Sequence, residues 1–248
     1  DKVNVSIPDI DDAKDWMKKN IMPMVEPRSN LFKYAEEQIL NDNELKSYLM
    51  DFVKTADFNI VDLQTQAEKE EMPQEFVDFL LNSKKLSEQE EEELRKDHSV
   101  ATTKTDFIHS VINGEEEERY SLPEGLQSDG TRRIFGIEAA IYNAIKKGGI
   151  LLIDEIECSL HPQLLKFILL NFLRKNSRAQ LFITTHYDPL LNEIGEIIRK
   201  DSVWFTEKEK SGHTTVYPLT EFRGLNRLSS IQKAYNLGKF GAVPNIDL

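Results

Sequence analysis

Two adjacent acids, Asp154 and Glu155, follow an uninterrupted apolar run from Ile150 to Ile153. A short apolar run without alternation predicts a strand that is buried on both faces of a parallel sheet. Open α/β sheets bind their ligands at the carboxyl ends of such strands, where these two carboxylates would emerge. One acid could hold a magnesium ion through its water shell while the other orients an attacking water. The alternative is that the acids merely solvate the end of the strand.

A second apolar run, Leu181 to Ile183, is followed by two threonines and His186. The residues between the runs, 164–173, place apolar side chains at helical spacing. Strand, helix and strand in this order predict a right-handed parallel crossover, which brings His186 to the same sheet edge as Asp154 and Glu155. A histidine there could contact a terminal phosphate or orient the attacking water. An ordinary polar loop residue is the alternative.

A third polar group precedes an amphipathic segment that predicts a helix from Ile134 to Lys147. The group consists of Ser128, Asp129, Gly130 and Thr131. Ser128 or Asp129 is a good N-cap, and the free backbone N–H groups of a helix start can bind an anion. An ordinary capped helix is the alternative. Gly148 and Gly149 predict a left-handed end of the helix.

Composition limits the function classes. The 248 residues carry a net charge of -12, which argues against a broad nucleic-acid-binding face, although DNA contact elsewhere in an assembly stays open. The single cysteine, Cys158, excludes a disulfide framework within the chain. We find no apolar run of membrane-spanning length and no signal peptide, which predicts a cytoplasmic protein without a membrane partner.

The first hundred residues predict a mainly helical insertion or lid subdomain. Residues 12–56 have helical patterns, with Asn43 as the expected cap of one helix, and Pro23 and Pro27 interrupt them. A further short helix is expected near residues 76–81. Residues 68–75 and 87–93 are charge-dense, and the glutamate run at 88–93 is most simply a solvated helix face or a mobile loop.

The remaining residues, 101–248, predict an α/β lobe with two hairpins. Asn113-Gly114 separates strand-like residues 105–112 from 117–122 and is a strong turn signal. Ser211-Gly212 similarly separates residues 202–205 from 214–217.

This order of elements resembles the C-terminal lobe of ABC-type ATPases, the branch that includes the SMC and overcoming-lysogenisation-defect proteins. In this resemblance Ser128 to Thr131 stands at the signature motif and Ile150 to Glu155 looks like Walker B. Ser159 to Pro162 looks like the D-loop, and His186 like the switch histidine. The block from Ile231 to Asn245 is similar to the ending of bacterial AAA-type, ABC-like ATPases found in phage-defence and abortive-infection operons. The resemblance implies an α/β fold with a parallel βαβ core.

The resemblance also implies ATP and Mg²⁺ as cofactors and a second copy of the ATPase head as partner, in a homodimer or higher oligomer. Asp154 would hold magnesium through water, Glu155 would polarise the attacking water and His186 would contact the γ-phosphate. Ser128 and the Gly130 backbone of one head would touch the γ-phosphate bound to the other head. The full set of expected cofactor-binding residues is Ser128, Asp129, Gly130, Thr131 and Ser159.

The sequence departs from the family pattern because it contains no Gly-x-x-x-x-Gly-Lys-Ser/Thr. We therefore expect the chain to be the C-terminal part of a longer polypeptide, or half of a split one, and to bind ATP poorly by itself.

The implied function is an ATPase that serves as sensor or motor of a bacterial anti-phage defence system, with a toxin or nuclease effector as partner. One alternative is an ATP-gated scaffold that sequesters and releases such an effector with little turnover. Another is an SMC-like ATPase of DNA repair or maintenance, which the absence of long heptad arms disfavours.

Overall fold

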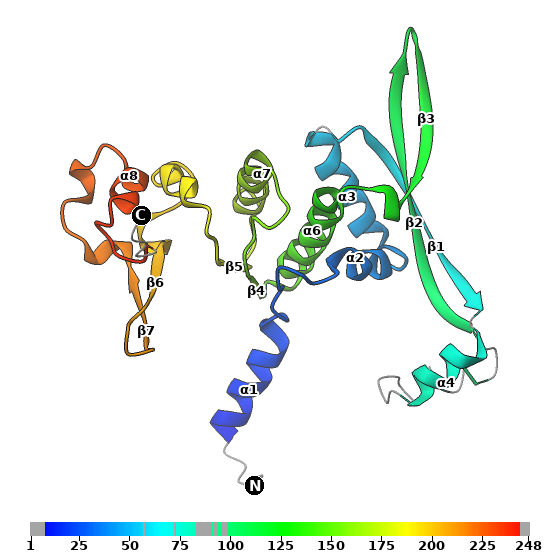
Figure 1. Ribbon diagram of the computed structural model, residues 1–248, viewed down its shortest axis with the longest axis horizontal. Coiled ribbons are helices and arrows are strands. Elements are labelled where there is room, and N and C mark those ends of the chain that lie inside the picture. The colour runs from blue at the N-terminus through cyan, green and yellow to red at the C-terminus, as the bar shows by residue number, and fades with distance from the viewer. Residues whose placement is uncertain are drawn as a thin grey trace.

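The computed structural model describes residues 8–56, 58–71, 73–82, 91, 94–95 and 99–243. These residues form a mixed α/β structure with a parallel pair of strands and two antiparallel sheets, which confirms the predicted fold class. The parallel pair and its helices occupy the middle of the molecule, with one antiparallel sheet on each side (Figure 1). Most of the glutamate run at 88–93 and the last five residues of the chain lie outside the described residues.

The central unit is the predicted crossover. Strand β4 (Ile150–Ile153) pairs in parallel with β5 (Gln180–Ile183), and helix α7 (Pro162–Leu173) connects them. On the other edge of β4, Ile21 and Val25 make parallel bridges to Ile150 and Ile153. The segment 21–25, which the sequence marked as a proline interruption, therefore extends this sheet by backbone pairing.

Helix α6 (Asp129–Lys147) lies against this sheet and ends as predicted. Ser128 caps its start, and Gly148, with φ 63°, ends it in the left-handed conformation. Within α6, Gly136 permits a close approach of helix α2 (Leu31–Ile39). A Cβ atom at Gly136 would lie 2.2 Å from Cβ of Leu31.

The expected helices of the N-terminal part are present as α1 (Pro8–Asn20), α2, α3 (Asn43–Thr55) and α4 (Gln74–Asn82). Asn43 was predicted as the cap of α3, but the cap is Asp42, whose carboxylate accepts a hydrogen bond from Leu45 N at 3.0 Å. Asn43 is instead the first helical residue. Helix α1 buries no side chain and extends away from the rest of the molecule (Figure 1).

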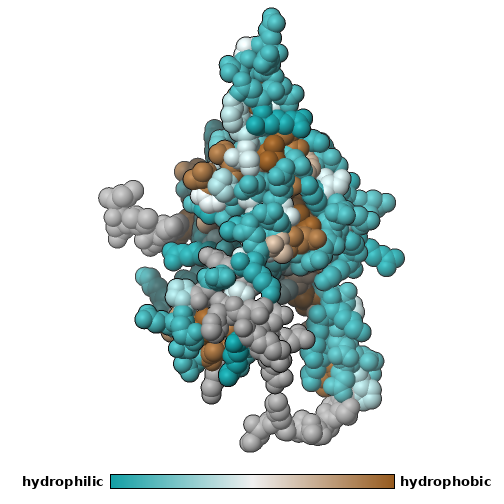
Figure 2. Space-filling model, turned by 90° about the vertical axis from the view of Figure 1, so that its right-hand side faces the viewer, coloured by the Kyte–Doolittle hydropathy of each residue, from teal (hydrophilic) through white to brown (hydrophobic). Residues whose placement is uncertain are grey.

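The prediction of a helical first hundred residues misses strand β1 (Ile60–Glu71). β1 pairs antiparallel with β2 (Ser99–Asn113), which pairs in turn with β3 (Glu116–Pro123). The hairpin turn between β2 and β3 is confirmed, with Gly114 at φ 69°. Figure 2 shows that the projecting end of this hairpin is covered mainly by hydrophilic side chains.

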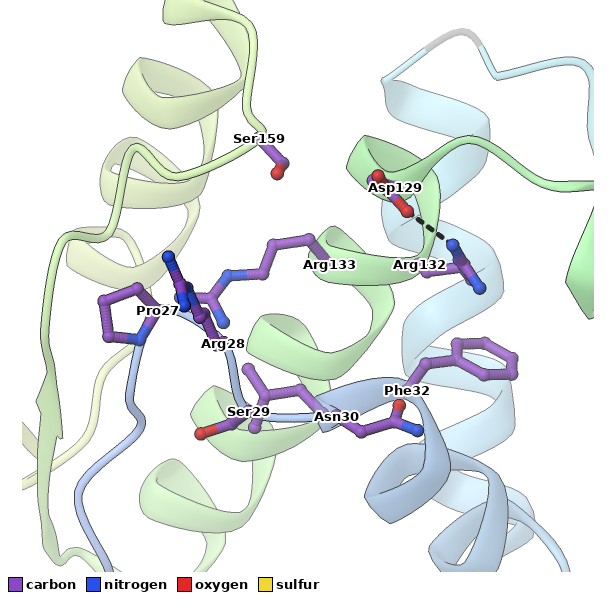
Figure 3. A pocket seen from close by; sticks show the side chains of 10 residues that line it. Pro27, Arg28, Ser29, Asn30, Phe32, Asp129, Arg132, Arg133 and Ser159 are labelled. Carbon is purple, nitrogen blue, oxygen red and sulfur yellow. Dashed lines mark hydrogen bonds and ion pairs between the residues drawn. The ribbon is translucent and has the colours of Figure 1, made fainter.

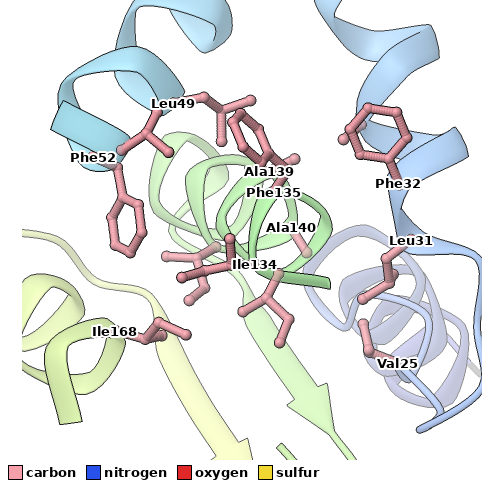
Figure 4. Packing of buried hydrophobic residues seen from close by; sticks show 14 of the residues in the cluster. Val25, Leu31, Phe32, Leu49, Phe52, Ile134, Phe135, Ala139, Ala140 and Ile168 are labelled. Atoms are coloured by element: carbon pink, nitrogen blue, oxygen red, sulfur yellow. The ribbon is translucent and has the colours of Figure 1, made fainter. Parts of the chain in front are cut away.

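Two separate hydrophobic clusters hold the described residues together. The larger one surrounds α6 and combines residues from both sides of position 100, among them Leu49, Ile134 and Ile168 (Figure 4). The boundary at residue 100 stays a prediction. The core that α2 and α3 share with α6 contains residues from both sides of it.

The smaller cluster lies in the C-terminal part and is built on Phe205, Leu219, Ala234 and Phe240. It joins the second predicted hairpin, β6 (Trp204–Lys208) and β7 (Thr214–Pro218), to helix α8 (Ile231–Asn236). Among the helices that the structure describes, none is both long and apolar enough to cross a membrane.

Candidate active site

The carboxyl ends of β4 and β5 bring Asp154 and Glu155, which were predicted as site residues, together with Thr184. Ile153 pairs with Ile183, so the residues that follow the two strands meet at one edge. The hydroxyl of Thr184 donates a hydrogen bond to Asp154 Oδ1 and accepts one from the backbone N–H of Glu155 at 2.9 Å. Thr184 was noted in the sequence only as part of a polar run. Its hydroxyl fixes the carboxylate of Asp154 and the start of the following loop.

Glu155 has a left-handed backbone, with φ 44°. Residues with a side chain seldom adopt this conformation, and such strain gathers at functional sites because the surrounding structure must enforce it. The Glu155 carboxylate stays 45% exposed and lies 3.7 Å from Nε2 of His186, which is 85% exposed. The predicted meeting of Glu155 and His186 is therefore present. At 3.7 Å the Glu155 carboxylate and the His186 ring form no hydrogen bond with each other. Both side chains are exposed enough to contact a ligand.

Glu157 is a site residue that the sequence reasoning missed. Its Oε1 atom accepts a hydrogen bond from the backbone N–H of His186 at 2.7 Å. Its Oε2 atom is buried and has no partner among the described residues. The signal was present in the sequence, since Glu157 is the third acid in the run after β4. The residue holds the loop that carries His186 against the loop that carries Glu155.

The start of α6 forms a second polar group with Ser159. Ser159 has φ 60°, and a Cβ atom at Gly130 would lie 2.8 Å from the Ser159 carbonyl oxygen. Glycine is therefore required where the helix start touches the loop after β4. Ser128 Oγ accepts a hydrogen bond from Thr131 N at 3.1 Å, and Asp129 forms an ion pair with Arg132.

The structure thus joins Ser128, Asp129, Gly130, Thr131 and Ser159 as one group and Asp154, Glu155 and His186 as another. Within the part of the chain that the structure describes, no hydrogen bond or ion pair connects the two groups.

Residues 15–192 match the family model described as "AAA domain, putative AbiEii toxin, Type IV TA system". The chain belongs to this AAA family. The match runs from α1 past β5 and includes both polar groups. It supports a nucleotide-binding P-loop ATPase of the AAA or ABC type.

The acidic edge of the AAA domain suits magnesium by its donor atoms. Asp154 offers a carboxylate beside the Thr184 hydroxyl, and Mg²⁺ prefers such hard oxygen donors. Mg²⁺ is commonly held by one or two carboxylates together with water and substrate phosphates. The described residues contain no group of three or more His, Cys, Asp or Glu side chains placed to hold a metal ion.

Proposed function

We propose that this AAA domain is part of an ATP-hydrolysing head that works as a dimer. Asp154, Glu155 and His186 of one head would act on a nucleotide that Ser128 to Thr131 and Ser159 of the other head complete. The observation that supports the proposal is the meeting of Asp154, Glu155 and His186 at the carboxyl ends of β4 and β5. A second copy would supply the group that each site lacks.

The geometry supports a distinct role for each acid. Asp154, held by Thr184, would bind magnesium, which supplies charge stabilisation at the phosphates when it is present. Glu155 would accept a hydrogen bond from the attacking water, because its carboxylate is exposed and its backbone is fixed by the Thr184 hydroxyl. His186 would contact the γ-phosphate from the adjacent loop.

The family description places related domains in the context of a toxin-antitoxin system. This context supports a role in abortive infection or anti-phage defence, in which the ATPase head acts with a toxin or nuclease effector. The second candidate function is an ATP-gated scaffold that holds and releases the effector with little turnover.

Glu155→Gln tests the assignment in the protein that carries this domain together with its complete nucleotide site. We expect ATP turnover to fall by a factor on the order of 100 or more, because the variant cannot accept a proton from water. ATP-induced dimers should persist, as measured by size-exclusion chromatography. The matched control is Glu37→Gln on the exposed face of α2, which should hydrolyse ATP at the wild-type rate. Unchanged hydrolysis in Glu155→Gln would refute the catalytic role.

Mixed dimers test whether the two polar groups act on one nucleotide across the dimer. When Ser128→Ala and Glu155→Gln are on different chains, one composite site keeps both groups and the other loses both. We expect about half of the wild-type turnover from such dimers. Slow turnover in the wild type, together with ATP-dependent capture of an effector, would instead favour the scaffold.

A further inference from the structure

A pocket of about 290 Å³ lies between the loop before α2 and the start of α6. Residues 27–32 form one wall, and Asp129, Arg132, Arg133 and Ser159 form the other (Figure 3). Three of the lining residues are arginines, although the chain as a whole carries a charge of -12. The pocket is therefore a local concentration of positive charge in an acidic protein.

Arg133 is the buried donor of this pocket. Its residue surface is 7% exposed, and Figure 3 shows its side chain extending from α6 toward Pro27 and Arg28. One guanidinium nitrogen, Nη1, donates a hydrogen bond to the carbonyl oxygen of Glu26 at 3.1 Å. The other two nitrogens, Nε and Nη2, are buried without a hydrogen-bond partner among the described residues.

Burying a guanidinium group while two of its nitrogens lack hydrogen-bond partners costs folding free energy, because arginine stays charged at any physiological pH. Burial lowers the pKa of Arg133, against a smaller opposing effect of Cys158. A buried charge of this kind is normally paired with an opposite charge. The neighbouring Arg132 is paired in this way, since it contacts Glu124 at 3.0 Å and Asp129.

Arg28 adds an exposed charge to the same pocket. Within the described part of the chain, no carboxylate forms an ion pair with Arg28 or Arg133. Two unpaired guanidinium groups on one pocket repel each other unless an anion lies between them. The hydroxyls of Ser29 and Ser159 stand on the same walls and add donors to those of the arginines.

We propose that this pocket binds a phosphate group, with Arg133 as its buried donor and Arg28 as its exposed donor. A phosphate has at least three acceptor oxygens and can use several donors from different walls of a pocket. The pocket shares Asp129 and Ser159 with the group that the proposed function assigns to a nucleotide, so the two sites are neighbours on one surface. Phosphate binding by a single chain requires neither ATP turnover nor a second head, and it can therefore be tested without them. The phosphate can be a free ion or the terminal phosphate of a nucleotide.

Titration of the chain with sodium phosphate tests the proposal, with sodium chloride at equal ionic strength as the reference. We expect saturable binding, observed as broadening of the ³¹P NMR signal and as a rise in the unfolding temperature. Arg28→Gln should weaken phosphate binding about tenfold, because it removes one charge-assisted hydrogen bond from an exposed position. The matched control is Arg223→Gln, an exposed arginine outside the pocket, which should bind phosphate like the wild type.

Because Arg133 is buried, Arg133→Gln is first checked for folding by circular dichroism. If it folds, it should lose saturable binding; if it does not, Arg28→Gln against Arg223→Gln decides the matter. Competition by ATP would identify the terminal phosphate of a nucleotide as an occupant, and binding of inorganic phosphate alone would identify the free ion. The proposal is overturned if the wild type shows no saturable binding. It is equally overturned if Arg28→Gln retains the wild-type affinity.

Discussion

Glu155 shows how a single residue links function to strain. Its left-handed backbone turns the chain sharply after β4 and directs the carboxylate toward His186. A left-handed conformation costs a residue with a side chain about 1 kcal/mol or more, and glycine avoids that cost. The chain nevertheless has glutamate at this position. The hydrogen bond from its N–H to the Thr184 hydroxyl helps to offset the local strain.

The strain can be measured by comparing two substitutions at the same position. We expect Glu155→Gly to have a free energy of unfolding about 1 kcal/mol above that of Glu155→Ala, because only glycine adopts this φ without penalty. Urea unfolding provides the measurement. Ser47, exposed within α3, is the matched control and should show the opposite order, with alanine more stable than glycine by about 1 kcal/mol. Equal stability of the two Glu155 variants would show that the conformation is not strained.

The sequence indicated which residues lie at the site, but it did not indicate which residues hold them in place. Asp154, Glu155 and His186 could be placed because each follows an apolar run that predicts a strand. The expected burial of these strands on both faces was wrong, since β4 is only alternately buried and Phe182 of β5 is 56% exposed. Thr184 and Glu157 act through hydrogen bonds between two loops, and such contacts depend on tertiary geometry. The buried state of Arg133 was equally hidden, since it comes from the approach of the loop at residues 26–30.

At the scale of elements, a buried carboxyl connects three helices. Glu138 of α6 is fully buried, and its Oε2 atom accepts hydrogen bonds from Tyr48 of α3 at 2.7 Å and Asn171 of α7 at 3.4 Å. Burial raises the pKa of Glu138 to about 8, against the smaller opposing effects of these hydrogen bonds and of the Lys175 charge. Its Oε1 atom has no partner among the described residues, which suits a carboxyl that keeps its proton.

This raised pKa gives a sign for the pH dependence of stability. In the unfolded chain Glu138 loses its proton near pH 4.5, whereas in the folded chain it keeps the proton until about pH 8. The folded state therefore binds more protons between these values, and the free energy of unfolding should fall as the pH rises through this window.

Glu138→Gln removes the titration, so the wild type should lose stability relative to this variant by up to about 1.4 kcal/mol per pH unit. Urea unfolding at several pH values measures the difference, with the exposed Glu37→Gln as control. A constant difference between wild type and Glu138→Gln from pH 5 to 8 would contradict the prediction.

The elements themselves were predictable where the pattern is local. Strands β4 and β5, helix α6 and both hairpins follow from apolar runs, caps and glycine turns. Strand β1 was not predicted, because its second half is rich in charge and is kept extended by pairing with β2, with Glu68 and Lys104 as a cross-strand ion pair. The segment 21–25 likewise depends on β4, which is distant in sequence.

At the scale of the whole molecule, the segment that follows His186 passes from one hydrophobic cluster, at Leu190, to the other, at Ile194. The larger cluster holds α6, β4 and β5, and the smaller one holds β6, β7 and α8. Asp188, two residues after His186, connects them, because its Oδ2 atom accepts hydrogen bonds from Gln232 at 2.9 Å and Asn236 at 2.8 Å. Helix α8 of the smaller cluster therefore holds the residues that follow His186 through these two hydrogen bonds to Asp188.

Polar contacts of this kind couple two clusters weakly, so we expect the clusters to unfold as separate cooperative units.

Phe240→Ala removes a side chain that is 1% exposed and should destabilise the smaller cluster by about 3–5 kcal/mol. Hydrogen exchange followed by mass spectrometry should then show faster exchange in β6, β7 and α8, with wild-type protection kept in α6 and β4. The matched variant Phe135→Ala, in the larger cluster at 2% exposure, should produce the reverse pattern. If Phe240→Ala accelerated exchange in α6 as much as in α8, the two clusters would form one cooperative unit. Helix α8 would then be an integral part of the core that positions Glu155 and His186.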